Sequence, residues 1–293
     1  MIDWSTYLPA LFGHATQVAE ATALGGQFDR HWRLTLQDGT RWFAKTAPAA
    51  AADRFAAEAD GLSALAQTGA VRVPEVIAHG VDADSDTAYL ILTWLDLRPL
   101  SAARAEAAAR ALVALHEAAP FPDRFGWHRD NYLGATPQQN GWEPNWAHFF
   151  VTRRIKPQLS WAKRNGFSRD AAARLEEALE GLPALFLEYA PRAALLHGDL
   201  WYGNIAESAT GEVVLIDPAV HQGDHESELA MMELFGGFPP AFYAAYRKLS
   251  GLHRDYERRK PLYTLYHILN HFNLFGSGYA REAERLIARL TGG

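Results

Sequence analysis

Five polar residues stand along this chain in an order that restricts the folds it can adopt. Lys45 ends a strand-like run, Glu58 lies on the helix-like segment that follows, and Asp199, Asn204 and Asp217 come much later. Thirteen positions separate Asn204 from Asp217, and the segment between them has the pattern of a tight hairpin. The hairpin would bring the amide and the carboxylate side by side at its open end.

This set of side chains matches what phosphoryl transfer from a nucleotide requires. A cation neutralises phosphate charge and a carboxylate holds the cation, which are roles for Lys45 and Glu58. A second carboxylate, Asp199, accepts the proton of the attacking hydroxyl, while Asn204 and Asp217 hold magnesium against the phosphates. The spacing His-Gly-Asp-x4-Asn is the catalytic-loop pattern of kinases with glycine in place of arginine. We therefore predict ATP and Mg²⁺ as cofactors and Asp199 as the catalytic base.

Each residue also has an ordinary structural interpretation. A lone Lys45 at a strand end is commonly a solvated edge residue, and Glu58 could lie on a solvated helix face. His197 could brace its loop through hydrogen bonds, and Asp217 before Pro218 could form a simple turn. The kinase interpretation is favoured because all the pieces occur in the required order and at the required spacing.

The remaining pattern predicts an α+β protein with a two-lobed, protein-kinase-like fold. Residues 1–95 form a small N-lobe of β-sheet plus helix, and residues 96–293 form a mainly helical C-lobe. The N-lobe starts with a helix from Asp3 to Leu24, and Asp38-Gly39 marks a hairpin turn between two β-prone runs. An amphipathic helix that ends at Gly69 and two further strands complete it.

Two places in the N-lobe are expected to contact the nucleotide. Gly25 and Gly26 precede the first hairpin and could form the turn that covers the phosphates, where backbone must approach closely. The apolar run YLILTWL leads into the C-lobe, and the backbone at Thr93 and Leu95 could bind the adenine edge. The second assignment rests on position alone.

Composition excludes several classes of protein. The chain has 34 acidic and 28 basic residues, a formal charge of −6, which gives no general attraction to nucleic acid or to anionic membranes. It has no cysteine, so disulfides and thiol catalysis are excluded. No apolar stretch reaches the ~18 residues of a membrane span, and the N-terminus does not have the pattern of a signal peptide. We expect a soluble cytoplasmic protein.

Several motifs closely resemble those of the fructosamine-3-kinase, or ketosamine kinase, family. They include LLHGDLWYGNIA, VLIDPAV and ELAMMELFGGFPPAFYAAY, and the resemblance covers about residues 25 to 276. The combination of HGDLW-x-GN, DPA and FGGFP separates this family from the aminoglycoside and choline kinases of the same fold. The resemblance implies ATP- and Mg²⁺-dependent phosphorylation of a sugar hydroxyl on a free or protein-bound ketosamine. It also suggests that phosphorylation makes the adduct labile and so serves deglycation.

The resemblance also directs attention to residues around the acceptor. Trp201, two residues after the base, could stack on a sugar ring or could simply pack between the lobes. Two weaker candidates come from the remaining polar residues. Asp224 could recognise the ketosamine amine or start a helix. His271, four residues after His267 on an expected helix, is expected to form hydrogen bonds within the large lobe but could line the substrate pocket. Tyr202 and His221 depart from the family pattern beside the expected sugar pocket, so their effect on specificity is open.

Two other functions compete with ketosamine phosphorylation. The same machinery could serve another small alcohol, such as an amino sugar. The chain could also be a nucleotide-binding pseudokinase that acts as an adaptor, although it keeps Lys45, Asp199, Asn204 and Asp217. The sequence leaves the preferred sugar, its amine carrier and the oligomeric state open.

Overall fold

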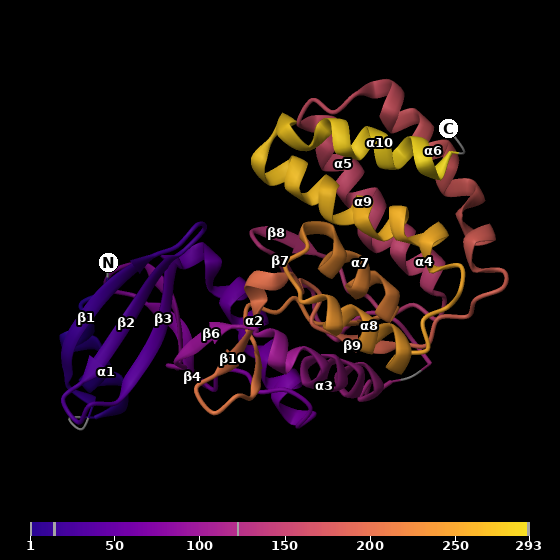
Figure 1. Ribbon diagram of the computed structural model, residues 1–293. Coiled ribbons are helices and arrows are strands. Elements are labelled where there is room, and N and C mark those ends of the chain that lie inside the picture. Colours follow the sequence, from indigo (N-terminus) through magenta and orange to yellow (C-terminus); the bar gives the residue numbers. More distant parts are fainter. Residues whose placement is uncertain (1, 14–15, 122, 292–293) are drawn as a thin grey trace.

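The computed structural model describes residues 2–13, 16–121 and 123–291 and shows two lobes of unequal size (Figure 1). The smaller lobe, in indigo and purple, holds the N-terminal sheet, and the larger lobe holds most of the helices. The sheet ends at Thr93, and the next strand, β6 (Leu97–Pro99), already pairs with β10 (Ile205–Ser208). The expected division at residue 95 falls between these two strands.

Five antiparallel strands form the sheet of the smaller lobe in the order β1-β2-β3-β5-β4. They are β1 (Val18–Gly25), β2 (Arg30–Leu36), β3 (Arg41–Pro48), β4 (Val76–Asp82) and β5 (Thr87–Thr93). Gly39, in the turn between β2 and β3, has φ +84°, a conformation that glycine adopts without strain. The hairpin predicted from Asp38-Gly39 is confirmed.

Helices α1 (Trp4–Phe12) and α2 (Ala52–Gln67) pack on opposite faces of this sheet. Side chains alternate between the faces along a strand. Ala44 of β3 is therefore buried in the core beneath α1, whereas its neighbour Lys45 points toward α2. The predicted amphipathic helix is confirmed, because α2 buries the apolar face that contains Phe55 and Leu62.

The predicted helix from Asp3 to Leu24 is wrong in its second half. α1 starts after Asp3, whose carboxylate accepts the Ser5 N–H at 3.1 Å, and ends before Gly13, which has φ +92°. From Val18 the chain is instead an edge strand paired with β2. Pairing with the neighbouring hairpin outweighs the helical propensity of this alanine-rich segment.

Helices dominate the larger lobe, as predicted. They are α3 (Ala105–Glu117), α4 (Trp146–Phe149), α5 (Lys156–Arg164), α6 (Arg169–Gly181), α7 (His225–Phe235), α8 (Pro240–Leu249), α9 (Tyr256–Phe275) and α10 (Ala280–Leu290). α9 is largely buried and packs against α5, α7 and α10. In the described part of the chain, none of the helices is long and apolar enough to cross a membrane.

Short strands fix the loops between these helices. They are β6, β10 and β11 (Val213–Leu215) in one sheet, β9 (Ala194–Leu196) with β12 (His221–Gly223), and β7 (Asn131–Leu133) with β8 (Thr136–Gln138). The predicted second hairpin is confirmed as β10–β11. The segment 119–146 contains the β7–β8 hairpin, whose three-residue strands are too short to give a recognisable alternation in the sequence.

Candidate active site

Lys45 contacts two carboxylates at the junction of the lobes. Its ammonium lies 2.8 and 3.0 Å from the carboxylate oxygens of Glu58 on α2. It also lies 2.8 Å from Oδ1 of Asp217, which follows β11. The Lys45 side chain is 6% exposed, whereas that of Asp217 is 45% exposed. Residues far apart in the sequence therefore meet here.

The segment from His197 to Asn204 forms a tight loop after β9. Gly198 has φ +86°, and a Cβ there would lie 2.0 Å from the carbonyl oxygen of Ala219, so only glycine fits. His197 is buried, donates from Nε2 to a backbone carbonyl at 2.8 Å and accepts the Asp199 N–H on Nδ1 at 3.3 Å. Asn204 donates from Nδ2 to the Asp199 carbonyl oxygen at 2.8 Å. The loop's own hydrogen bonds thus fix the positions of Asp199 and Asn204.

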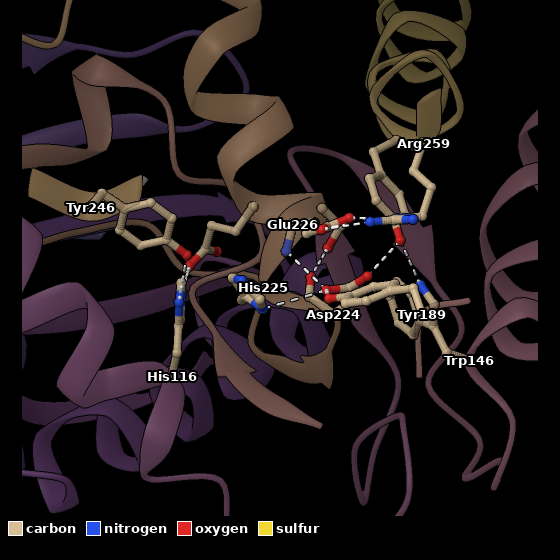
Figure 2. Close-up of polar contacts among 11 residues, drawn as sticks. His116, Trp146, Tyr189, Asp224, His225, Glu226, Tyr246 and Arg259 are labelled. Atoms are coloured by element: carbon tan, nitrogen blue, oxygen red, sulfur yellow. Dashed lines mark hydrogen bonds and ion pairs between the residues drawn. The ribbon is translucent and has the colours of Figure 1, made fainter. Parts of the chain in front are cut away.

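A carboxylate on α7 holds the same loop from behind. Glu228 accepts the Gly198 N–H on Oε1 at 2.7 Å, and its Oε2 lies 2.8 Å from Nε2 of His116. Nδ1 of His116 lies 3.0 Å from the hydroxyl of Tyr246, and Figure 2 shows these two side chains pointing toward one another. His116, Glu228 and Tyr246 are all buried, so this anchor is shielded from solvent.

Asp217 adopts a left-handed backbone conformation, with φ +55°. Aspartate tolerates this region better than most residues, but it still carries strain. Such strain persists where the surrounding structure fixes the residue, which is common at functional sites. Here the contact with Lys45 holds the side chain in place.

The charges at this junction shift one another's pKa values. Burial opposes the charge on Lys45, but Asp217 and Glu58 outweigh it and raise the pKa of Lys45. Burial also acts on Asp217, yet the adjacent Lys45 lowers the pKa of that carboxyl. Burial, together with the charges of Asp217 and Glu228, raises the pKa of Asp199 to about 7. A carboxylate with a pKa near neutrality is suited to accept a proton at physiological pH.

A cleft of about 290 Å³ between the lobes contains these groups. Its polar lining consists of Gln27, Asp29, His31, Lys45, Arg54, Glu58, Asn131, Tyr132, Asp199, Asn204 and Asp217. All five residues of the predicted phosphoryl-transfer set are therefore found in one cavity. Asn131 and Tyr132 come from β7, so this hairpin forms one wall of the cleft.

The turn between β1 and β2 covers one side of the cleft. Gly25 and Gly26 have φ +94° and +127°, and a Cβ on Gly26 would lie 2.0 Å from the carbonyl oxygen of Asp29. The residues that line the cleft are the next three, Gln27, Phe28 and Asp29. The two glycines therefore shape the turn, and their neighbours face the cavity.

Arg54 lines the cleft and was not predicted. It lies one helical turn before Glu58 on α2, and its guanidinium donates to both carboxylate oxygens of Asp29, one of them at 2.7 Å. The pair is largely buried, with side chains 16% and 6% exposed. It ties the glycine turn to the helix that holds Lys45. The four-residue spacing from Glu58, which puts both side chains on one helix face, was the available signal.

Thr93 and Leu95 lie where the chain passes from one lobe to the other. The backbone N–H of Thr93 already donates to the Glu75 carbonyl oxygen at 2.9 Å. The backbone of Leu95 makes no hydrogen bond within the described part of the chain. The N–H of Thr93 is therefore already used, whereas both backbone groups of Leu95 are left to contact an adenine edge.

Trp201 lines the cleft with 42% of its surface exposed. Its ring packs over Gly203, where a Cβ would lie 2.3 Å from the indole. This contact explains the glycine of the HGDLW-x-GN motif. It holds the indole in the cleft near Asp199, where part of the ring remains free to contact a ligand.

His271 lies outside the cleft lining, on α9. It is half-buried, with Nδ1 2.8 Å from a backbone carbonyl oxygen of its own helix. Its ring packs between Phe235 and Phe275, at centroid distances of 5.0 and 5.5 Å. His271 is thus part of an aromatic group beside the cleft.

The structure does not bring Asp224 into the cleft. The side chain is 0% exposed and accepts hydrogen bonds from the hydroxyls of Tyr189 and Tyr263 at 2.8 and 2.6 Å. It also accepts the Glu226 N–H at 3.0 Å, as the N-cap of α7. Figure 2 shows Asp224 next to Tyr189, with the ion pair of Glu226 and Arg259 adjacent. Of the two roles considered for Asp224, the structure supports the helix start.

Tyr202 and His221 also point away from the cleft, contrary to expectation. Tyr202 donates to a backbone carbonyl at 3.1 Å and packs on Phe238 and against Gly237, where a Cβ would lie 2.8 Å from it. His221 is buried on β12 and stacks on Phe149. Tyr202 directly follows Trp201, but its side chain points in a different direction. Neighbours in the sequence are therefore not always neighbours in the site.

Comparison with known proteins agrees with this geometry. A model of the fructosamine kinase family matches residues 3–292. The chain is 44% identical over 276 residues to a probable ketoamine kinase of Synechocystis, covering 94% of this chain and 91% of that one. It is 34% identical to a chloroplastic protein-ribulosamine 3-kinase of Arabidopsis thaliana, covering 94% and 83%.

A solved structure confirms the predicted fold. The crystal structure of a candidate fructosamine-3-kinase from Haemophilus somnus superimposes with a TM-score of 0.86 at 27% identity, covering 98% of this chain and 96% of that one. The family expected from the motifs is the family found, and this chain belongs to the fructosamine kinase family.

Proposed function

We propose that the protein is an ATP-dependent kinase that phosphorylates a sugar hydroxyl of ketosamines such as ribulosamines and fructosamines. The observation that carries this proposal is the convergence of Lys45, Glu58, Asp199, Asn204 and Asp217 on one cleft between two lobes. The acceptor class is suggested by relatives named ketoamine kinase and protein-ribulosamine 3-kinase. Because ATP is the donor, we also propose a cytoplasmic location.

Asp199 acts as the general base in this proposal. It lines the cleft, and its raised pKa of about 7 makes it a better proton acceptor than an ordinary carboxylate. The hydroxyl that it orients attacks the γ-phosphorus, its proton passes to Asp199, and the bond to the ADP oxygen breaks. Lys45, held by Glu58, supplies fixed positive charge for the phosphates.

The glycine turn and Leu95 complete the nucleotide site. Gly25 and Gly26 shape the turn above the phosphates, and Arg54 adds a second cation to that side of the cleft. Leu95 offers unused backbone groups to the adenine edge. Thr93 contributes less, since its N–H is already bonded.

Asn204 and Asp217 fit a Mg²⁺ site. Asn204 uses its amide N–H within the loop, which leaves the amide oxygen for a cation, and Asp217 uses only Oδ1 for Lys45. Mg²⁺ takes oxygen donors of this kind together with phosphate oxygens and water. Bound there, the ion would neutralise charge on the phosphates.

The metal assignment has a test that does not depend on turnover. Asp217→Ala should weaken ATP binding when Mg²⁺ is present and change it little when EDTA is present. Titration of ATP by calorimetry in both conditions checks this. If the ATP affinity of the variant depends on Mg²⁺ as strongly as that of the wild type, Asp217 is not a ligand of the metal.

The acceptor sugar stacks on Trp201 in this proposal. The indole is held beside Asp199, and its exposed part faces the cleft. His271 lies farther out, so it would contact the amine carrier and not the reacting hydroxyl. Asp224 has no part in it, because its carboxylate is enclosed.

Coupled ATP turnover against a small panel tests the proposal. Ribulosyl-lysine, fructosyl-lysine, ribose, an aminoglycoside and choline are each supplied with ATP and Mg²⁺. Turnover confined to the two ketosamines supports the proposal and ranks the sugars. Turnover on the aminoglycoside or choline instead would assign another small alcohol, and ATP binding without consumption of any acceptor would favour an adaptor role.

A further inference from the structure

One side chain of the glycine turn crosses the cleft and touches the opposite lobe. Phe28 stands at the tip of the turn between β1 and β2. Its ring stacks on Phe275, the last residue of α9, with centroids 6.1 Å apart and an interplanar angle of 27°. Phe28 also lines the cleft that contains Asp199 and Trp201. The contact therefore joins the two lobes at the mouth of the site.

A second segment of the larger lobe completes this closure. Gly134 lies in the turn between β7 and β8 and has φ +63°. A Cβ on Gly134 would lie 3.3 Å from the Phe28 ring and 3.6 Å from the side chain of Leu274. The wall of the cleft is thus shaped to receive Phe28.

The receiving surface is aromatic and continues away from the cleft. We call it the aromatic platform: Phe235, His271, Phe275 and Tyr279. His271 lies at its centre, with ring centroids 5.0, 5.5 and 5.1 Å from those of Phe235, Phe275 and Tyr279. Phe28 and Phe275 are nevertheless 42% and 43% exposed, so their contact can open without disrupting the core.

The position of Phe28 is fixed by its neighbours in the turn. Asp29, the next residue, is held by both guanidinium nitrogens of Arg54 on α2. Gly26 is closely packed against the Asp29 carbonyl oxygen. The turn is therefore ordered by the same helix that carries Glu58, the partner of Lys45. Phe28 is therefore connected, through Asp29, Arg54 and α2, to the lysine that is expected to contact the nucleotide.

Closure at this position has a chemical consequence. Phosphoryl transfer depends mainly on positioning and charge stabilisation, so water that reaches the γ-phosphate competes with the sugar hydroxyl. We infer that Phe28 and Phe275 form a clasp that excludes water and so selects the sugar hydroxyl as the acceptor. This inference rests on the proposed kinase function and adds the residues that set its acceptor selectivity.

The test compares ATP hydrolysis with transfer in Phe28→Ala, Phe275→Ala and the double variant. ADP is measured by a coupled assay, and phosphorylated ribulosyl-lysine is measured by mass spectrometry in the same reaction. We expect the ratio of ADP to phosphorylated acceptor to rise roughly 3- to 10-fold in each single variant, the range that one aromatic pair supports. The double variant should be no worse than either single one, because losing one ring already opens the clasp.

Leu24→Ala is the matched control. Leu24 is 45% exposed on β1, close to the same turn, but is outside the cleft lining. The ratio of ADP to phosphorylated acceptor in Leu24→Ala should equal that of the wild type. Phe28→Tyr, which keeps an aromatic ring at this position, should retain most of the selectivity. An unchanged ratio in both single variants, or additive effects in the double variant, would overturn the clasp.

Failure of the kinase proposal would give a different result. If the wild type phosphorylates no ketosamine, the clasp is still tested by ATP hydrolysis without an acceptor. Hydrolysis per bound ATP should then rise in Phe28→Ala and Phe275→Ala but not in Leu24→Ala. No rise in either variant would reject the clasp independently of the acceptor.

Discussion

At the scale of single residues, the ammonium of Lys45 forms ion pairs with two carboxylates, those of Glu58 and Asp217. The Glu58 side chain is 12% exposed and that of Asp217 is 45% exposed, so the first pair is desolvated and the second is open to the cleft. Breaking a buried pair by removing one partner costs about 3–5 kcal/mol, whereas an exposed pair contributes little. Glu58 is therefore the fixed partner of Lys45, and Asp217 is free to exchange the lysine for another cation.

Asp199→Asn tests the base directly. The amide keeps the shape of the side chain but cannot accept the proton, so turnover should fall by about 10²–10⁴-fold. ATP binding should stay within about twofold, since Lys45 and Asp217 are untouched. Steady-state kinetics and ATP titration measure the two quantities. A variant that retains near-full turnover would remove Asp199 from this role.

The rate should also depend on pH through Asp199. Its pKa is raised to about 7, by burial first and then by Asp217 and Glu228. The active form is the deprotonated one, so kcat/KM is expected to be level at high pH and to fall about tenfold per pH unit well below pH 7. ATP affinity measured over the same range separates this effect from weaker nucleotide binding. A level profile down to about pH 5.5 would contradict the assignment.

At the scale of elements, glycines let the loops approach one another closely. Gly198 fits against Ala219, Gly203 lies beneath Trp201, and Gly237 receives Tyr202. These contacts connect the HGDLW-x-GN, DPA and FGGFP motifs, which are separate segments of the sequence. The motifs are thus parts of one packing arrangement around the catalytic loop.

Gly203→Ala should separate acceptor binding from nucleotide binding. The backbone of Gly203 has no positive φ, so the only penalty is the new Cβ, 2.3 Å from the Trp201 ring. The indole must move, and the KM for the ketosamine should rise roughly tenfold or more, the loss expected from misplaced substrate. ATP affinity should change little.

Gly278→Ala is the control for this substitution. Gly278 also lies in a 3₁₀ turn, but a Cβ there meets nothing within 4 Å. Both kinetic constants should match those of the wild type. An equal rise in KM for the two variants would mean that the Trp201 contact does not position the acceptor.

At the scale of the whole molecule, the sequence was informative where residue type and spacing determine geometry. The two hairpins and α2 were predictable because turn residues and apolar spacing act locally. The edge strand β1 was missed because its partner, β2, decides its conformation. Arg54 was missed although its four-residue spacing from Glu58 puts both side chains on one face of α2. The burial of Asp224 and the direction of Tyr202 depend on tertiary packing, which spacing along the chain does not encode.

Stability at acid pH should reflect His267, which is buried at the centre of the larger lobe on α9. Burial, with the nearby charges of His271 and Arg154, lowers its pKa from 6.5 to about 3. Below about pH 6.5 the unfolded chain therefore binds a proton at His267 that the folded chain does not bind. The stability of the folded chain falls as pH falls, because this proton favours the unfolded state. Below about pH 6, the free energy of unfolding should lose ~1.4 kcal/mol more per pH unit in the wild type than in His267→Leu, whereas above about pH 7 the two slopes should be equal. Urea unfolding between about pH 5 and pH 7.5 measures both slopes, and parallel curves would show that His267 is protonated in the folded state.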